Sequence, residues 1–149
     1  MRRTLGPDDT GSFSASIADF VGEVMAHSKD VCRKTFIELG TNIMEATPVD
    51  TGMTRNNWLP STGSPDNGTR EIADPTGATV KGETESVAAG WEPEKEDAYL
   101  TNNSIVAVVL EYGLYPNPPK HGTGKTINGF STQAPAGMVR TTIARMKGG

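Results

Sequence analysis

The chain has few of the side chains that enzymes use for covalent or metal chemistry. Its 149 residues include one cysteine, Cys32, and two histidines, His27 and His121. A single cysteine cannot form an intrachain disulfide, and the spaced cysteine pairs that bind zinc are absent. His27 and Cys32 are five positions apart, so they do not share one face of a helix. A Cys–His nucleophile pair and a zinc site are therefore disfavoured.

Positive charge and long apolar runs are also scarce. Lysine and arginine number 14 against 18 acidic residues, which gives a net charge of -4 and no basic footprint for tight nucleic-acid binding. No apolar run approaches the roughly 20 residues of a membrane-spanning helix. No apolar segment follows Arg2 and Arg3, as it would in a signal peptide. We expect a soluble protein made in a cytoplasm, with no cofactor and no membrane partner.

Hydrophobic residues are few, and glycine and proline are plentiful. Hydrophobic residues make up 35% of the chain, and 17 glycines and 10 prolines accompany them. This composition predicts one compact core with long irregular loops, some of which become ordered on neighbouring subunits. We interpret residues 1–13 as a flexible N-terminal arm and residues 14–149 as a single domain.

The clearest periodicity predicts a long amphipathic helix over about residues 15–46. Pro48 ends it, because the proline ring disfavours helical backbone at residue 47. Residues at steps of three or four form one face of this helix: Ile17, Phe20, Val21, Val24, Ser28, Val31, Thr35, Leu39 and Ile43.

The elements that follow are shorter. We expect the following segments, in chain order: a tight turn over 47–52, a strand over 54–59, a loop over 60–78 with a hairpin turn at Asn67-Gly68, a helix over 79–91, a charged turn over 92–97 and a strand over 98–102.

In the last third of the chain, the sequence pattern predicts one or two short helices. Residues 105–112 are too apolar for a surface segment and suit a short helix or a strand. Residues 113–130 are an extended loop. Pro135 can occupy the first turn of a final helix with Met138 and Met146 on its apolar side. The sum is an α+β fold, with a long N-terminal helix packed on a small, mostly antiparallel sheet, short helices and long loops.

One loop resembles part of a nucleotide site. Gly122-Thr-Gly-Lys-Thr126 matches the end of a phosphate-binding loop, but the full pattern needs a glycine at the position of Pro119. A buried strand before the loop and a helix after it are also missing. The sequence favours a plain loop with a solvated lysine. A nucleotide- or DNA-binding accessory factor that uses Lys120–Lys125 stays as an alternative.

Two carboxylates allow a hydrolase as a further alternative. Asp50 and Glu111 stand in compact, patterned settings where a glycosidase-like pair is conceivable. Aromatic residues are only 6% of the chain, so no sugar-binding platform accompanies the pair. We expect Asp50 to accept hydrogen bonds from backbone amides in its turn. We expect Glu111 to pair with an arginine, either Arg55 or Arg140.

Three short strings carry a family resemblance. They are Thr47-Pro-Val-Asp-Thr-Gly52 followed by Arg55 and Trp58, then Thr101-Asn-Asn103 followed by Leu110-Glu-Tyr-Gly113, and last Ser131-Thr-Gln-Ala-Pro-Ala-Gly-Met-Val-Arg140. In this order and spacing, over about residues 15–146, the chain resembles the minor tail component or tail-completion (neck, head–tail joining) proteins of tailed bacteriophages. It departs from that pattern at 104–107, where the family usually has a proline and an aromatic residue, and in its long loop over 114–130.

The resemblance implies a structural role without catalysis. Such proteins form homo-oligomeric rings, often sixfold, at the neck or head-proximal end of the tail. They complete the tail and join it to the head connector, and genomic DNA passes through the ring. The implied partners are copies of the chain and neighbouring connector, tail-tube or sheath proteins, and the implied location is the virion, after synthesis in the host cytoplasm. The residues that match the family motif are Pro48, Asp50, Thr51, Gly52, Arg55, Trp58, Asn102, Asn103, Glu111, Tyr112, Gly113, Gln133, Ala134, Pro135, Gly137, Met138 and Arg140.

These motif residues have two kinds of expected role. Gly52, Gly113, Pro135 and Gly137 suit special backbone geometry. Trp58, Tyr112 and Met138 are expected in the core rather than at an interface. Arg55, Glu111 and Arg140 form either a buried ionic cluster within one subunit or contacts between subunits.

Overall fold

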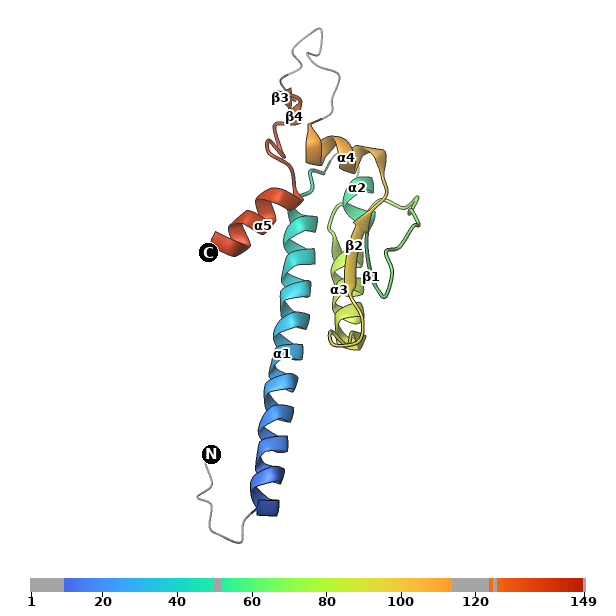
Figure 1. Cartoon of the computed structure of the whole chain (residues 1–149). Helices are drawn as coiled ribbons and strands as arrows, with labels where there is room; N and C mark the ends of the chain where they lie inside the picture. The colour runs from blue at the N-terminus through green and yellow to red at the C-terminus, as the bar shows by residue number, and fades with distance from the viewer. Residues whose placement is uncertain (1–9, 50–51, 114–123, 125, 149) are drawn as a thin grey trace.

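A computed structural model describes residues 10–49, 52–113, 124 and 126–148, with the side chains described from residue 19 onward. Figure 1 shows one long helix with the other elements gathered along its second half. The predicted α+β class is confirmed. The elements in chain order are α1 (Thr10–Ala46), α2 (Met53–Asn56), β1 (Trp58–Thr62), α3 (Ala78–Gly90), β2 (Ala98–Asn102), α4 (Ile105–Tyr112), β3 (Thr126–Ile127), β4 (Phe130–Ser131) and α5 (Val139–Gly148).

Helix α1 confirms the predicted long helix but begins at Thr10. Residues 10–13 are therefore helical rather than part of the predicted arm, and residues 1–9 lie outside the described range. The second half of α1 packs against α3 and α5, whereas its first half extends beyond every other labelled element (Figure 1). Among the described residues, none before Lys29 has a hydrogen bond or ion pair with another element.

The apolar face predicted for this helix has two different fates. Ile43 and Met44 near its C-terminal end are buried in the core. Phe20, Val24 and Val31 in its first half are exposed, and Phe20 retains 65% of its accessible surface. Periodicity identified the helix correctly, but it did not distinguish the part that packs within the chain from the part that faces outward.

The main sheet joins β1 and β2 in antiparallel order, with Trp58 opposite Asn102 and Thr62 opposite Ala98. Helix α3 contacts both α1 and β1, so it lies between the long helix and the sheet. The predicted strand over 98–102 and the predicted helix over 79–91 are both confirmed.

The predicted strand over 54–59 is wrong in its first half. Gly52 adopts a left-handed backbone, and the Asn56 amide donates to the Gly52 carbonyl at 3.1 Å. This bond closes a helical turn, so Met53–Asn56 form α2 and the strand starts only at Trp58. The strand then continues to Thr62, into the segment predicted as a loop.

The hairpin predicted at Asn67-Gly68 is also wrong, because β1 takes β2 as its partner. The loop over 63–77 is instead fixed by the side chains of three asparagines, Asn56, Asn57 and Asn103. Asn57 Oδ1 accepts from the Arg70 amide at 2.6 Å, and Asn103 Nδ2 donates to the carbonyls of Asp66 and Gly68. Side-chain amides satisfy backbone groups that no strand partner reaches.

The hydrophobic core lies where α1, α3, β1 and α4 meet the turn before α5. Trp58 and Met138 are buried in it, which confirms that part of the prediction. The Trp58 indole N–H donates to Thr47 Oγ1 at 2.7 Å, and Thr47 Oγ1 in turn donates to the Ile43 carbonyl at 2.9 Å. This chain of bonds ties the start of β1 to the C-terminal end of α1.

Replacing Trp58 with phenylalanine tests that tie. Trp58→Phe keeps an aromatic ring in the core but removes the N–H donor, so we expect a loss of about 1–2 kcal/mol in the free energy of unfolding. Urea titration followed by circular dichroism measures the change. Trp91→Phe provides a second tryptophan replacement, in which a half-buried indole N–H loses its bond to the Glu96 carbonyl. A Trp58→Phe protein as stable as the wild type would contradict a structural role for the Thr47 bond.

Asp74 precedes α3, and its carboxylate accepts hydrogen bonds from groups at the start of this helix. Its Oδ1 accepts from the Thr76 hydroxyl at 2.6 Å and its Oδ2 accepts from the Thr79 amide at 3.0 Å. These bonds, the Thr76 hydroxyl first, hold the pKa of the Asp74 carboxyl well below its ordinary value of 3.8. A carboxylate at this position also complements the positive end of the helix dipole.

The depressed pKa of Asp74 gives stability a defined acid dependence. A carboxyl with a lowered folded pKa contributes stability above its ordinary pKa, and loses that contribution as the pH falls through its folded pKa. We expect Asp74→Asn to lower the melting temperature at neutral pH, and we expect the gap from the wild type to narrow as the pH falls below 3.8. Thermal melts across that pH series measure the gap. A gap that stays constant into strong acid would refute the contribution of the charge.

In the C-terminal third, the structure decides between helix and strand for residues 105–112 and shows a different start for the last helix. Residues 105–112 form a helix, α4, and Ser104 caps it by accepting from the Ala107 amide at 3.3 Å. Helix α5 begins at Val139 rather than at Pro135, which lies in the preceding turn. Gly137, between these two positions, has a left-handed backbone, so a helix cannot run from Pro135 into α5.

The predicted extended loop over 113–130 ends in a small hairpin. Strands β3 and β4 pair antiparallel, with Thr126 opposite Ser131. Residues 114–123 and 125 of the loop lie outside the described range. Across the described part of the chain, no helix is both long enough and apolar enough to span a bilayer.

Candidate assembly site

The three motif strings meet in the folded chain although they are far apart in sequence. Asn102 Nδ2 donates to the Thr54 carbonyl at 2.9 Å, which connects the second string to the segment after the first. Glu111 connects the second string to the third through bonds to Met138 and its neighbours. The strings therefore fix one set of contacts at the end of the molecule where α2, α4 and the start of α5 lie (Figure 1).

Glu111 is the centre of these contacts. Its Oε2 accepts from the amides of Met138 at 2.7 Å and Val139 at 2.8 Å, and its Oε1 accepts from the Arg140 amide at 3.1 Å. These are the free N–H groups at the start of α5, where a helix favours a negative charge. The carboxylate is buried, so it acts as an N-terminal cap supplied by a distant helix.

Arg140 completes this arrangement and confirms one of the two expected pairings. Its Nε lies 3.1 Å from Glu111 Oε1, and its Nη2 donates to the Glu111 carbonyl. Its guanidinium carbon also lies 5.4 Å from the centre of the Tyr112 ring and 6.0 Å from that of Phe130. The Arg140 side chain is half exposed while the Glu111 side chain is buried, so the pair presents positive charge to the surface.

Arg55 does not join this pair. Its guanidinium donates to three backbone carbonyls, those of Pro75 at 2.8 Å, Glu45 at 3.0 Å and Thr47 at 2.8 Å. Two of these carbonyls end α1, where a cation complements the helix dipole. The expected cluster of three charged motif residues is thus reduced to Glu111 and Arg140.

Several motif residues have the backbone role expected of them. Gly52, Gly113 and Gly137 all have left-handed backbone. A Cβ on Gly52 would lie 2.4 Å from the Pro75 nitrogen, and one on Gly137 would lie 2.7 Å from the Glu111 carbonyl oxygen. Pro135 is exposed in a turn.

Of the remaining motif residues, some lie in the core, some lie at the surface, and some lie outside the described residues. Ala134 is buried and packs in the core, whereas Gln133 is exposed. Pro48 is half-buried directly after α1. Asp50 and Thr51 lie outside the described residues, so the expected bonds from backbone amides to Asp50 stay a prediction.

Tyr112 was expected in the core, and this is wrong. It is 59% exposed and belongs to an apolar surface on the outer side of α4, which we call the α4 face: Ile105, Val106, Val108 and Tyr112. The expectation that residues 105–112 are too apolar for the surface fails with it. Only Ala107, Leu110 and Glu111 of α4 are buried.

A second apolar surface lies on the first half of α1. We call it the α1 stripe: Phe20, Val21, Val24, Met25 and Val31. The two surfaces hold nine of the eleven large hydrophobic side chains that are exposed among the described residues. Exposed apolar surface concentrated in this way marks interaction sites.

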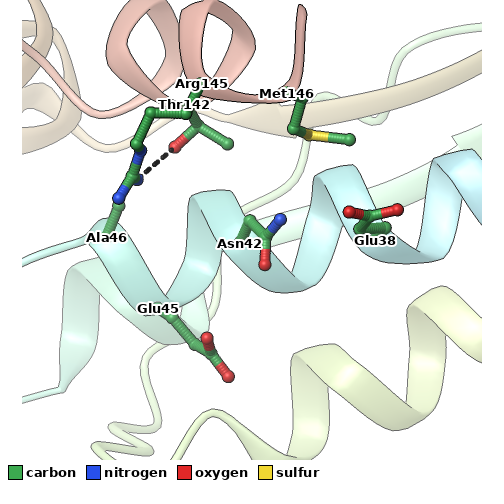
Figure 2. A pocket seen from close by; sticks show the side chains of 7 residues that line it. All are labelled: Glu38, Asn42, Glu45, Ala46, Thr142, Arg145 and Met146. Carbon is green, nitrogen blue, oxygen red and sulfur yellow. Dashed lines mark hydrogen bonds between the residues drawn. The ribbon is translucent and has the colours of Figure 1, made fainter. Parts of the chain in front are cut away.

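Residues of α1 and α5 line an open cleft of about 570 Å³. Figure 2 shows Glu38, Asn42 and Glu45 from α1 opposite Thr142, Arg145 and Met146 from α5. The dashed line in it joins Arg145 to the Thr142 hydroxyl at 3.5 Å. Neither histidine nor cysteine lines the cleft.

In the described part of the chain, no group of three or more His, Cys, Asp or Glu side chains could hold a metal ion. Both carboxylate oxygens of Glu111 already accept bonds from the start of α5 and from Arg140, which leaves them badly placed for acid–base work. The Lys120–Lys125 loop of the nucleotide alternative lies almost wholly outside the described residues.

No protein-family model, no curated protein and no solved structure matches this chain. Its function is therefore proposed from its own residues and contacts.

Proposed function

We propose that this chain is a structural virion protein of a tailed bacteriophage and that it acts by assembly, not catalysis. Copies of it form a ring, expected to be sixfold, at the neck or head-proximal end of the tail. The ring completes the tail and joins it to the head connector. Neighbouring connector, tail-tube or sheath proteins are its partners, and DNA passes through the opening.

The observation that carries the assembly role is the pair of exposed apolar surfaces on α1 and α4. A monomer with nine large hydrophobic side chains exposed on two helices pays a cost in water that association removes. The resemblance of the three motif strings to neck and tail-completion proteins supports the position in the virion. Identical subunits with two complementary surfaces close into rings when the rotation between them permits.

The contacts of the motif residues suit a rigid building block. Glu111 and Arg140 connect α4 to α5, and Asn102 connects β2 to α2 through the Thr54 carbonyl. The same contacts disfavour the hydrolase alternative for Glu111. The net charge of -4 would keep passing DNA from adhering to the ring, because phosphate affinity depends on lysine and arginine.

Electron microscopy of antibody-labelled phage particles tests this proposal. We expect label at the junction of head and tail, and tails that fail to join heads when the chain is not produced. A protein absent from particles would contradict the proposal. Loss of nucleotide or DNA binding on Lys125→Ala would favour the accessory-factor alternative instead, and the structural proposal predicts no such binding to lose.

A further inference from the structure

We infer that the α1 stripe of one copy packs against the α4 face of the next copy. This inference rests on the proposed ring and names the surfaces that build it. The two surfaces lie at opposite ends of the chain, because the first half of α1 extends away from the end that carries α4 (Figure 1). Only a second copy can therefore bring a stripe onto an α4 face.

The α1 stripe does not lie on the side of α1 that packs against α3. Lys29, Arg33 and Gly40 face α3 and the turn after it, through Glu92, Trp91 and Thr84 respectively. At 3.6 residues per turn, the middle of the stripe is rotated about two fifths of a turn from these residues. The stripe thus requires a partner that approaches from a different side than α3.

The α4 face is short enough to lie wholly along the α1 stripe. Phe20 to Val31 covers about 16 Å of helix, and the eight residues of α4 cover about 11 Å, at a rise of roughly 1.5 Å per residue. Phe20 and Tyr112 provide one exposed aromatic ring on each surface, the kind of side chain that anchors protein interfaces.

The charges beside the two surfaces are complementary. Asp19 and Glu23 have no ion-pair partner among the described residues, whereas Asp30 further along α1 pairs with Lys34 at 3.0 Å. The free charge beside the stripe is therefore negative. The α4 face is bordered by the exposed guanidinium of Arg140, whose acidic partner is buried. Opposite charges at the rim of an apolar contact favour this pairing and set its register.

A head-to-tail contact also covers more surface than the alternative of two α1 stripes packing together. A symmetric α1–α1 contact makes a dimer and leaves the α4 face of both copies exposed. A contact between stripe and α4 face covers both surfaces on every copy once the ring closes.

Disulfide trapping tests the inference in the full chain with Cys32 replaced by serine. We expect Val24→Cys with Val108→Cys in the same chain to give, on oxidation, a ladder of covalent species beyond dimers. Each single substitution alone should give little cross-linking. The double variant Ile72→Cys with Val108→Cys is the control, because Ile72 is 76% exposed but lies outside both surfaces.

The outcomes separate this inference from the proposed ring. Cross-linked dimers from Val24→Cys alone would place α1 against α1 and overturn the inference. A wild-type ring with no ladder from the double variant would also overturn it, while the ring itself stands. A wild-type protein that never self-associates would contradict both this inference and the proposed ring. As a second readout, we expect Val24→Glu to weaken self-association at least tenfold without changing the far-UV circular dichroism spectrum, and Ile72→Glu to leave association unchanged.

Discussion

Replacing Glu111 with alanine is expected to lower the free energy of unfolding by about 3 kcal/mol, which corresponds to a fall of roughly 10 °C in melting temperature. The carboxylate accepts from three consecutive amides at the start of α5 and from Arg140. Its removal leaves a buried Met138 amide without an acceptor and removes the only side-chain cap that the described residues give this helix. The loss is larger than for an ordinary cap because the acceptor is charged and buried.

Matched variants separate the cap from the ion pair. Arg140→Ala keeps the cap and removes a half-exposed partner, so we expect a loss of only about 1 kcal/mol. Glu111→Gln keeps an acceptor oxygen but loses the charge and should fall between the two. Chemical denaturation of the three proteins gives the comparison. Equal losses for Glu111→Ala and Arg140→Ala would mean that the ion pair, and not the cap, stabilises the start of α5.

Gly52→Ala is expected to cost about 3 kcal/mol or more, from positive-φ strain and from overpacking. Gly52 has a φ of 85°, and the added Cβ would lie 2.4 Å from the backbone nitrogen of Pro75. The obstacle is backbone, so it cannot rotate away as a flexible side chain can. Two amides, those of Asn56 and Asp74, also donate to the Gly52 carbonyl, so a shift there disturbs both α2 and the loop before α3.

A glycine in an ordinary helical position provides the control. Gly82 lies within α3, and a Cβ there would meet nothing within 4 Å. Gly82→Ala should stabilise the protein by about 0.5–1 kcal/mol, because alanine loses less conformational freedom on folding. Thermal melts of both variants decide the matter. A Gly52→Ala protein that melts with the wild type would contradict the contact between Gly52 and Pro75.

The fold could be predicted where a local pattern and the tertiary packing agree. Three elements were predicted correctly in this way: α1 from its apolar spacing, α3 from its helix-forming residues, and β2 from its strand-forming residues. The prediction failed where a distant group decides the outcome. Pro135 suits a helix start by itself, but Gly137 and the Glu111 carboxylate together place the first turn of α5 at Val139.

The candidate site could be predicted only in part. The sequence predicted an arginine partner for Glu111 but left Arg55 and Arg140 as alternatives, and the structure shows that the partner is Arg140. The exposure of Tyr112 and of the α4 face did not follow, because apolar spacing identifies a hydrophobic face but does not tell whether the rest of the chain covers that face. The exposure of Phe20 and Val24 was missed for the same reason.

The mass of the purified protein in solution, measured by native mass spectrometry over a range of concentrations, tests the central claim most directly. We expect one closed assembly of a fixed number of copies, with six as the expected number, and a shift toward the monomer in Val24→Glu. A wild type that stays monomeric at every concentration would contradict the account of this chain as a ring-forming subunit.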